Sequence, residues 1–76
     1  MNISEKKQRF IELANKRVNK ALKQISLISN LSNTNNYEYT QDEVKQIIRA
    51  LESEIQMCKE RFRKQDSEES RQFSLK

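Results

Sequence analysis

The chain has 76 residues and a net charge of +4, with 34% hydrophobic residues, 34% charged residues, and no glycine, proline, histidine or tryptophan. Its length allows one domain at most, and the absence of glycine and proline removes the usual breakers of a helix. No run of about 18 apolar residues is present, so we expect no membrane-spanning helix.

The first predicted element is a helix over 5–29. Ser4 is a favourable N-cap residue, and Glu5 places negative charge in the first turn. Apolar residues then recur at alternating intervals of three and four, which predicts an apolar stripe along one helix face. This first apolar stripe consists of Ile11, Ala14, Val18, Ala21, Ile25 and Ile28. The residues that flank it and widen the face to be buried are Phe10, Leu13, Leu22, Leu27 and Leu31.

The next segment, 30–40, is a polar connection that we call the hinge. It contains four asparagines, at positions 30, 33, 35 and 36. Asparagine tolerates left-handed backbone better than most residues other than glycine. We therefore expect these asparagines to provide the left-handed conformations with which the chain leaves the first helix and turns back.

A second helix is predicted over 41–64. Thr40 and Glu43 have the spacing of a capping box, in which each side chain accepts a hydrogen bond from the other residue's backbone amide. Tyr39 and Val44 stand at the two positions of a hydrophobic staple, and Asp42 adds negative charge near the positive end of the helix dipole. Three features thus agree on where this helix begins.

The second helix repeats the alternation of threes and fours. This second apolar stripe consists of Val44, Ile48, Leu51, Ile55, Cys58 and Phe62, and Ile47 widens it. Positive charge at Arg61, Arg63 and Lys64 suits the negative end of a helix dipole. From position 65 the apolar period is lost, so residues 65–76 are predicted to form a mobile polar tail.

The predicted fold is all-α: residues 1–64 form an antiparallel, coiled-coil-like two-helix hairpin. A hairpin this short has too little core for comfortable stability on its own. We therefore expect a homodimer that forms a four-helix bundle, or a hairpin that completes its core on a partner protein. The residues expected in its core or dimer interface are Phe10, Ile11, Val18, Leu22, Ile25, Ile48, Leu51, Ile55 and Phe62.

The chemistry available to the chain is limited. It has no histidine, one cysteine, no glycine-rich phosphate loop and no recognisable set of carboxylate ligands. We therefore predict no enzyme activity, catalytic residues, cofactor, metal or small-molecule substrate. Cys58 is interpreted as a small buried residue of the second stripe, and a redox sensor is the alternative. Its lone thiol fits a reducing compartment, and the N-terminus lacks the apolar centre of a secretory signal, so we expect a cytoplasmic protein.

The most suggestive functional feature is a row of cations opposite the first stripe. This basic ridge consists of Lys6, Arg9, Lys16, Lys20 and Lys23, with Arg17 nearer the edge of the stripe. Such a ridge could neutralise the phosphates of a nucleic acid. The alternative is an ordinary solvated face that keeps a bundle soluble. A membrane-surface role is not expected, because the apolar faces are committed to helix packing.

The hinge offers a second surface, suited to contact with a partner protein. Tyrosine presents a rigid amphipathic contact, and Tyr37 has this role here or else covers the open end of the bundle. The residues predicted for this contact are Leu31, Asn33, Asn35, Asn36 and Tyr37.

The run KRVNKALKQISLISNLSN, followed by NYEYTQDEVKQIIRALESEI, resembles a group of small bacterial, phage and plasmid proteins. They share an L-x-x-N-L-x-N segment followed by Tyr and Tyr-Thr. The resemblance implies a helical hairpin of bacterial or mobile-element origin, and it assigns no functional residues. The leading hypothesis is a non-enzymatic accessory protein, such as a regulator or inhibitor, that self-associates and docks on a macromolecule. The alternative is a nucleic-acid-binding protein that uses the basic ridge.

Overall fold

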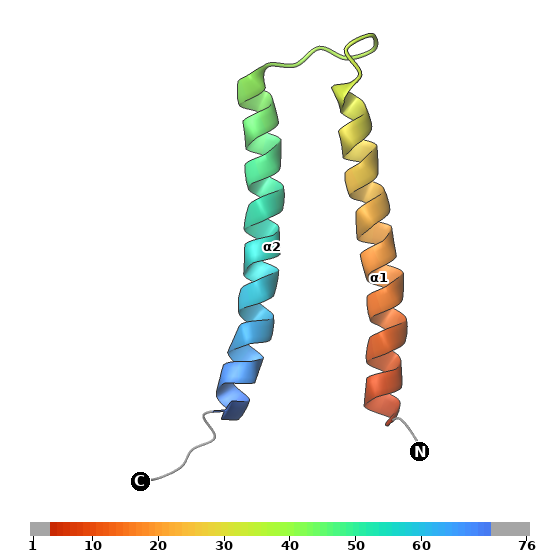
Figure 1. Ribbon diagram of the computed structural model, residues 1–76, viewed down its shortest axis with the longest axis vertical. Coiled ribbons are helices and arrows are strands. Elements are labelled where there is room, and N and C mark those ends of the chain that lie inside the picture. Colours follow the sequence, from red (N-terminus) through yellow and green to blue (C-terminus); the bar gives the residue numbers. More distant parts are fainter. Residues whose placement is uncertain (1–3, 71–76) are drawn as a thin grey trace. The chain divides into compact units, whose positions relative to one another are not determined.

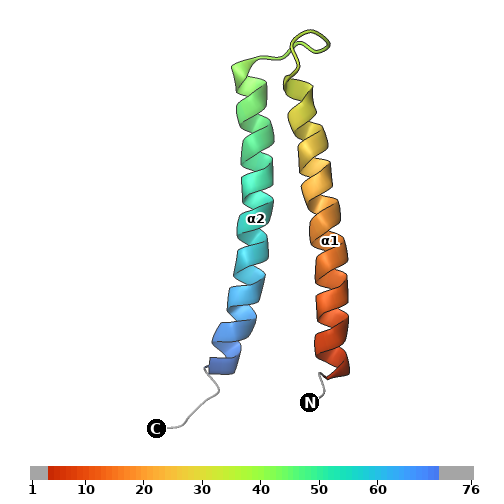
Figure 2. The same cartoon turned by 45° about the vertical axis from the view of Figure 1, so that its right-hand side comes forward.

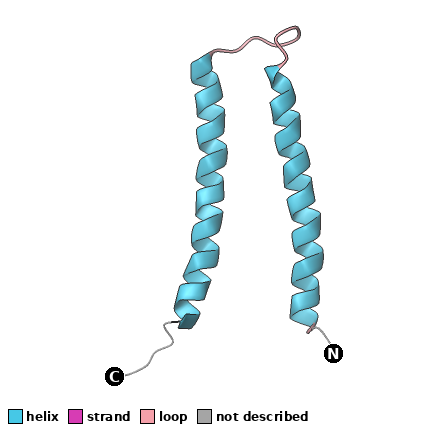
Figure 3. Ribbon diagram, in the orientation of Figure 1, coloured by secondary structure: helices cyan, strands magenta, loops and turns pink. Residues whose placement is uncertain are grey.

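The computed structural model describes residues 4–70, with side-chain surroundings for residues 4–65. These residues form two α-helices, α1 (Glu5–Ser29) and α2 (Gln41–Ser70), and a short 3-10 helix, η1 (Asn30–Ser32), that follows α1 (Figure 1). Figure 3 shows helix and loop and no strand in this part of the chain, so it is all-α, as predicted. The chain divides into two units, Met1–Glu38 and Tyr39–Lys76, which carry α1 with η1 and α2 respectively.

The N-terminus of α1 is capped by Ser4, as predicted. Its backbone is extended, with φ −63° and ψ 155°, and its Oγ accepts a hydrogen bond of 3.1 Å from the Lys7 amide. Its carbonyl accepts the first helical bond, 2.9 Å from the Gln8 amide. The Lys7 Nζ atom lies 5.6 Å from the ring centroid of Phe10, within the range of a cation–π contact. From this start α1 continues without a break to Ser29, as the turned view in Figure 2 shows.

The C-terminus of α1 corrects one expectation. No residue in 4–70 has a positive φ angle, so the asparagines of the hinge do not supply left-handed backbone. Instead Asn30 stays right-handed, at φ −65° and ψ −18°, and the chain tightens into η1. The Asn33 amide donates to the Asn30 carbonyl over 3.3 Å, and Asn33 itself turns to extended backbone with ψ 102°. A 3-10 turn satisfies the last carbonyls without any left-handed residue.

Asn33 then organises the loop with its own hydrogen-bonding groups. Its side-chain Oδ1 accepts from the Asn35 amide at 2.9 Å, an Asx turn. Its carbonyl accepts from the amides of Asn36 and Tyr37, at 3.1 and 3.0 Å. Asparagine therefore shapes the hinge through its side-chain amide.

The N-terminus of α2 is the predicted capping box. The Glu43 amide donates to Thr40 Oγ1 over 3.0 Å, and the Thr40 amide donates to Glu43 Oε1 over 2.8 Å. The Val44 amide donates to the Thr40 carbonyl over 3.1 Å and closes the first turn. Tyr39 and Val44 are both half-buried while residues 40–43 are exposed, which fits the expected staple.

The C-terminus of α2 lies at Ser70, six residues beyond the predicted end at Lys64, so the predicted polar tail over 65–76 begins too early. Residues 65–70 lack an apolar period, but they also lack glycine and proline, so nothing stops the helix there. The preceding turns carry a supporting side-chain network, described below. Residues 71–76, the rest of the predicted tail, lie outside the described residues.

No described residue is buried, and five are half-buried: Ala14, Ile28, Tyr39, Val44 and Leu51. Of the nine residues predicted for the core or dimer interface, Leu51 is half-buried and the others are exposed, from 37% at Ile25 to 64% at Phe62. Cys58 is exposed rather than buried, because a single helix cannot cover its own face. The structure is that of one chain, so burial of these residues in a bundle stays a prediction.

Within residues 4–70, neither helix has a stretch both long and apolar enough to traverse a bilayer.

Candidate interaction surfaces

The basic ridge lies on α1 and is fully solvent-facing. All six cations of the prediction are exposed, and within the described residues none of them forms an ion pair or a side-chain hydrogen bond. At 1.5 Å per residue the ridge from Lys6 to Lys23 is about 25 Å long. The structure thus places all predicted nucleic-acid contacts on one helix, namely Lys6, Arg9, Lys16, Arg17, Lys20 and Lys23.

The two helices differ in net charge. α1 has seven lysines and arginines against two glutamates, which gives +5. α2, with its observed end at Ser70, has six lysines and arginines against eight acidic residues, which gives −2. The longer helix changes the sign of α2, because the added segment contains Asp66, Glu68 and Glu69. The excess positive charge of the two helices therefore lies on α1.

Two leucines lie in line with cations of the basic ridge, one inside its span and one just after Lys23. Leu13 and Leu27 are 37% and 49% exposed. With 100° of rotation per residue, Leu13 lies about 110° and Leu27 about 150° round the helix from the middle of the first apolar stripe. They share one line with Lys6 and Lys20 at heptad spacing, and they lie farther from the stripe than the flanking positions expected from the sequence. The same seven-residue spacing that relates the cations of the ridge also relates these two leucines to Lys6 and Lys20.

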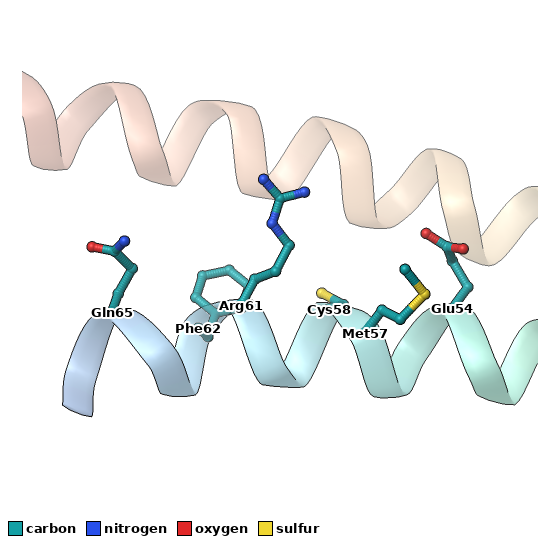
Figure 4. Close-up of a pocket in the computed structure, with 6 residues that line it drawn as sticks. All are labelled: Glu54, Met57, Cys58, Arg61, Phe62 and Gln65. Carbon is teal, nitrogen blue, oxygen red and sulfur yellow. The ribbon is translucent and has the colours of Figure 1, made fainter. Parts of the chain in front are cut away.

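The second apolar stripe carries an open hollow near the C-terminal part of α2. Figure 4 shows the side chains that line it, which project from successive turns of the same helix: Glu54, Met57, Cys58, Arg61, Phe62 and Gln65. Two sulfur atoms and an aromatic ring form an apolar floor, with Arg61 and Glu54 as charged neighbours. Met57, which the sequence analysis does not name, is 57% exposed. Sulfur and aromatic groups adapt well to an apolar partner surface.

The outer face of α2 pairs its own charges. Arg63 Nη2 donates to both carboxylate oxygens of Glu60, at 2.7 and 2.9 Å, and Gln56 Nε2 donates to Glu60 Oε2 at 3.1 Å. The hydrogen bond from Arg63, and then its positive charge, lower the pKa of the Glu60 carboxyl. The same contact raises the pKa of Arg63. The side chains are 71% and 50% exposed, for Arg63 and Glu60, so water screens this ion pair.

The hinge surface combines exposed side chains with an ordered backbone. Tyr37 is 49% and Leu31 is 44% exposed. Asn33, Asn35 and Asn36 are exposed as well, and the three hydrogen bonds to Asn33 hold this turn together. The predicted protein contacts therefore lie on one short segment of the first unit.

No cluster of potential metal ligands occurs in the described part of the chain. Its cysteine, aspartate and glutamate residues form no group of three or more that could hold a metal ion. The prediction that the chain is not an enzyme remains a prediction.

Comparison of the chain with protein-family models, with curated proteins and with solved structures finds no match. The resemblance to small bacterial, phage and plasmid proteins also remains a prediction.

Proposed function

We propose that the chain is a non-enzymatic binding protein of bacterial or mobile-element origin, which self-associates into a four-helix bundle and docks on a macromolecular partner. One observation carries this proposal: both helices have regular apolar stripes, yet no described residue is buried. Contiguous apolar surface of this kind is typical of an interface. A chain of this size gains stability by oligomerisation.

The hairpin is the arrangement that best uses the two stripes. From Ile11 to Ile28 the first stripe is about 26 Å long, and from Val44 to Phe62 the second is about 27 Å long. An antiparallel return brings stripes of matching length together.

Two such hairpins bury what one leaves exposed. Within one hairpin each helix can cover only part of its neighbour's apolar face. The flanking residues then remain for a second copy: Phe10, Leu22 and Ile47, which are 52%, 59% and 39% exposed. A second copy is the natural occupant because it brings the same stripes at the same spacing.

Sedimentation equilibrium at micromolar concentration tests self-association. We expect the natural chain to sediment at twice its mass of 9.1 kDa. Val18→Lys puts a charge in the first stripe and should give a monomer, whereas Asn19→Lys, one residue away and off the stripe, should leave the dimer intact. Circular dichroism reports whether each variant remains helical. A natural chain that is monomeric and fully helical would contradict the proposal.

Nucleic-acid binding is the second candidate function, favoured by the exposed and unpaired cations of the basic ridge. Each lysine that neutralises a phosphate releases counterions, so the affinity should fall steeply with salt. Anisotropy of a labelled random-sequence duplex, at low and physiological salt, measures this directly. Lys16→Glu with Lys20→Glu should abolish binding. Lys45→Glu with Lys59→Glu, the same charge change on α2, should have a much smaller effect. A duplex that is not bound even at low salt would eliminate this function.

A further inference from the structure

The outer face of α1 combines cations with leucines, and neither function proposed above uses the leucines. Leu13 and Leu27 are separated by 14 positions, about 21 Å along the helix. Leu31, in η1, follows four residues later and is 44% exposed. We call this set, with the basic ridge, the leucine–lysine face. It lies entirely within the first unit.

The charges on this face identify the chemistry of its partner. α1 has a net charge of +5, and its two acidic residues, Glu5 and Glu12, are separated from the line on which Leu13, Lys20 and Leu27 lie. The ridge cations have no ion-pair partner among the described residues. A partner must therefore supply negative charge along about 25 Å.

The leucines distinguish between the anionic partners. A nucleic acid engages cations through its phosphates and has no use for leucines at these intervals. An anionic membrane surface requires a continuous apolar face, often with tryptophan, whereas here Lys20 stands between the two leucines. A partner helix with apolar residues at heptad spacing and acidic residues beside them matches both the leucines and the cations of this face. Across such an interface the apolar residues interlock and the flanking charges pair.

We propose that the leucine–lysine face docks an acidic amphipathic helix of a partner protein. The inference rests on the proposed function, in which self-association occupies the opposite face of α1. Leu13 and Leu27 anchor the partner helix, and Arg9, Lys16, Lys20 and Lys23 pair with its acidic flanks. Because charge alone also attracts nucleic acids, specificity for the helix resides in the leucines.

Fluorescence anisotropy with designed peptides tests the proposal. The first probe is a labelled three-heptad peptide with leucine at the core positions and glutamate at the flanking positions. The second has alanine in place of leucine and the same charge. Random-sequence duplex DNA and phosphatidylglycerol vesicles complete the set. The protein variants are Leu13→Ala with Leu27→Ala and, as a matched control on the side of the helix, Asn19→Ala with Ser26→Ala.

We expect the leucine-containing peptide to bind at least about tenfold more tightly than the alanine peptide. Burial of one or two leucine side chains provides an affinity difference of this size. The double leucine variant should lose that preference, and the control variant should keep it. Equal binding of the two peptides, or tighter binding of DNA or vesicles with no effect of the leucine variant, would overturn the proposal. Sedimentation distinguishes failure of this inference from failure of self-association. A dimer that does not prefer the leucine-containing peptide contradicts only this inference. A monomer that does prefer it contradicts only self-association.

Discussion

Replacing Thr40 with alanine should destabilise the protein, because it removes the acceptor that begins α2. In the structure Thr40 Oγ1 accepts from the Glu43 amide at 3.0 Å, and Glu43 Oε1 accepts from the Thr40 amide at 2.8 Å. Thr40→Ala deletes the first bond directly. It also weakens the bond from the Thr40 amide to Glu43 Oε1, because the two bonds of a capping box hold the same turn in place together.

The expected magnitude follows from the exposure of the cap. Loss of a threonine N-cap costs about 0.5–2 kcal/mol. Thr40 and Glu43 are both exposed, so water replaces part of the lost bonding and a cost of about 1 kcal/mol is expected. For a domain of this size that cost lowers the melting temperature by about 4–8 °C. Glu43→Gln keeps an acceptor oxygen and loses only the charge, so its effect should be smaller and should vanish at high salt.

Thermal unfolding followed by circular dichroism measures both effects, with all chains at one concentration because the proposed self-association would make the melting temperature concentration-dependent. Thr34→Ala is the matched control: Thr34 lies in the loop, is exposed, and has no side-chain hydrogen bond in the described part of the chain. If Thr40→Ala and Thr34→Ala melt at the same temperature, the capping box does not stabilise α2 and the reasoning is refuted.

Three further predictions concern the other hydrogen-bonded features. Ser4→Ala should fray the start of α1 at a cost of about 1 kcal/mol, seen as faster amide exchange in its first turn; unchanged exchange would contradict the cap. Asn33→Ala should loosen the loop before Tyr37 because it removes Oδ1, the acceptor of the Asn35 amide; faster exchange of that amide, with the helix content unchanged, measures the effect. Arg63→Gln should raise the pKa of Glu60 toward its ordinary value, as measured by NMR titration. Because the pKa of Glu60 is lowered in the folded chain, the ion pair contributes above the ordinary glutamate pKa, and the contribution is lost as the pH falls through the lowered value.

The starts of both helices could be predicted because the relevant interactions are local. A serine or threonine oxygen and an amide three residues later meet as soon as the first turn forms, so the residue types and their spacing suffice. The Ser4 cap and the Thr40–Glu43 box are therefore found where the sequence places them.

The end of α1 at Ser29 was predicted correctly, but the end of α2 was not, because no single residue requires it. Loss of apolar period after Lys64 indicates that the helix is no longer buried, and it does not indicate that the helix stops. The hinge illustrates the same difficulty. Asparagine can help to end a helix in two ways, by left-handed backbone or by a side-chain hydrogen bond. Asn33 uses the side-chain hydrogen bond, and the residue type alone does not specify which of the two occurs.

The candidate surfaces could be predicted to the extent that they depend on helical period. The six cations lie together on α1 because they recur at intervals set by the helix. Leu13 and Leu27 were misplaced because apolar residues were assumed to belong to the stripe. What covers the stripes is not specified by either helix alone, because burial depends on a second surface.

The contrast between the helices indicates which one recognises a partner. On α2, Arg63 and Gln56 engage Glu60, and the positive and negative charges of the helix nearly balance, with a net charge of −2. On α1 the cations of the ridge lack such partners among the described residues and lie in line with two leucines. A face that leaves cations unpaired and apolar groups exposed gains the most from association. Together the two proposals give α1 self-association on one face and partner recognition on the other.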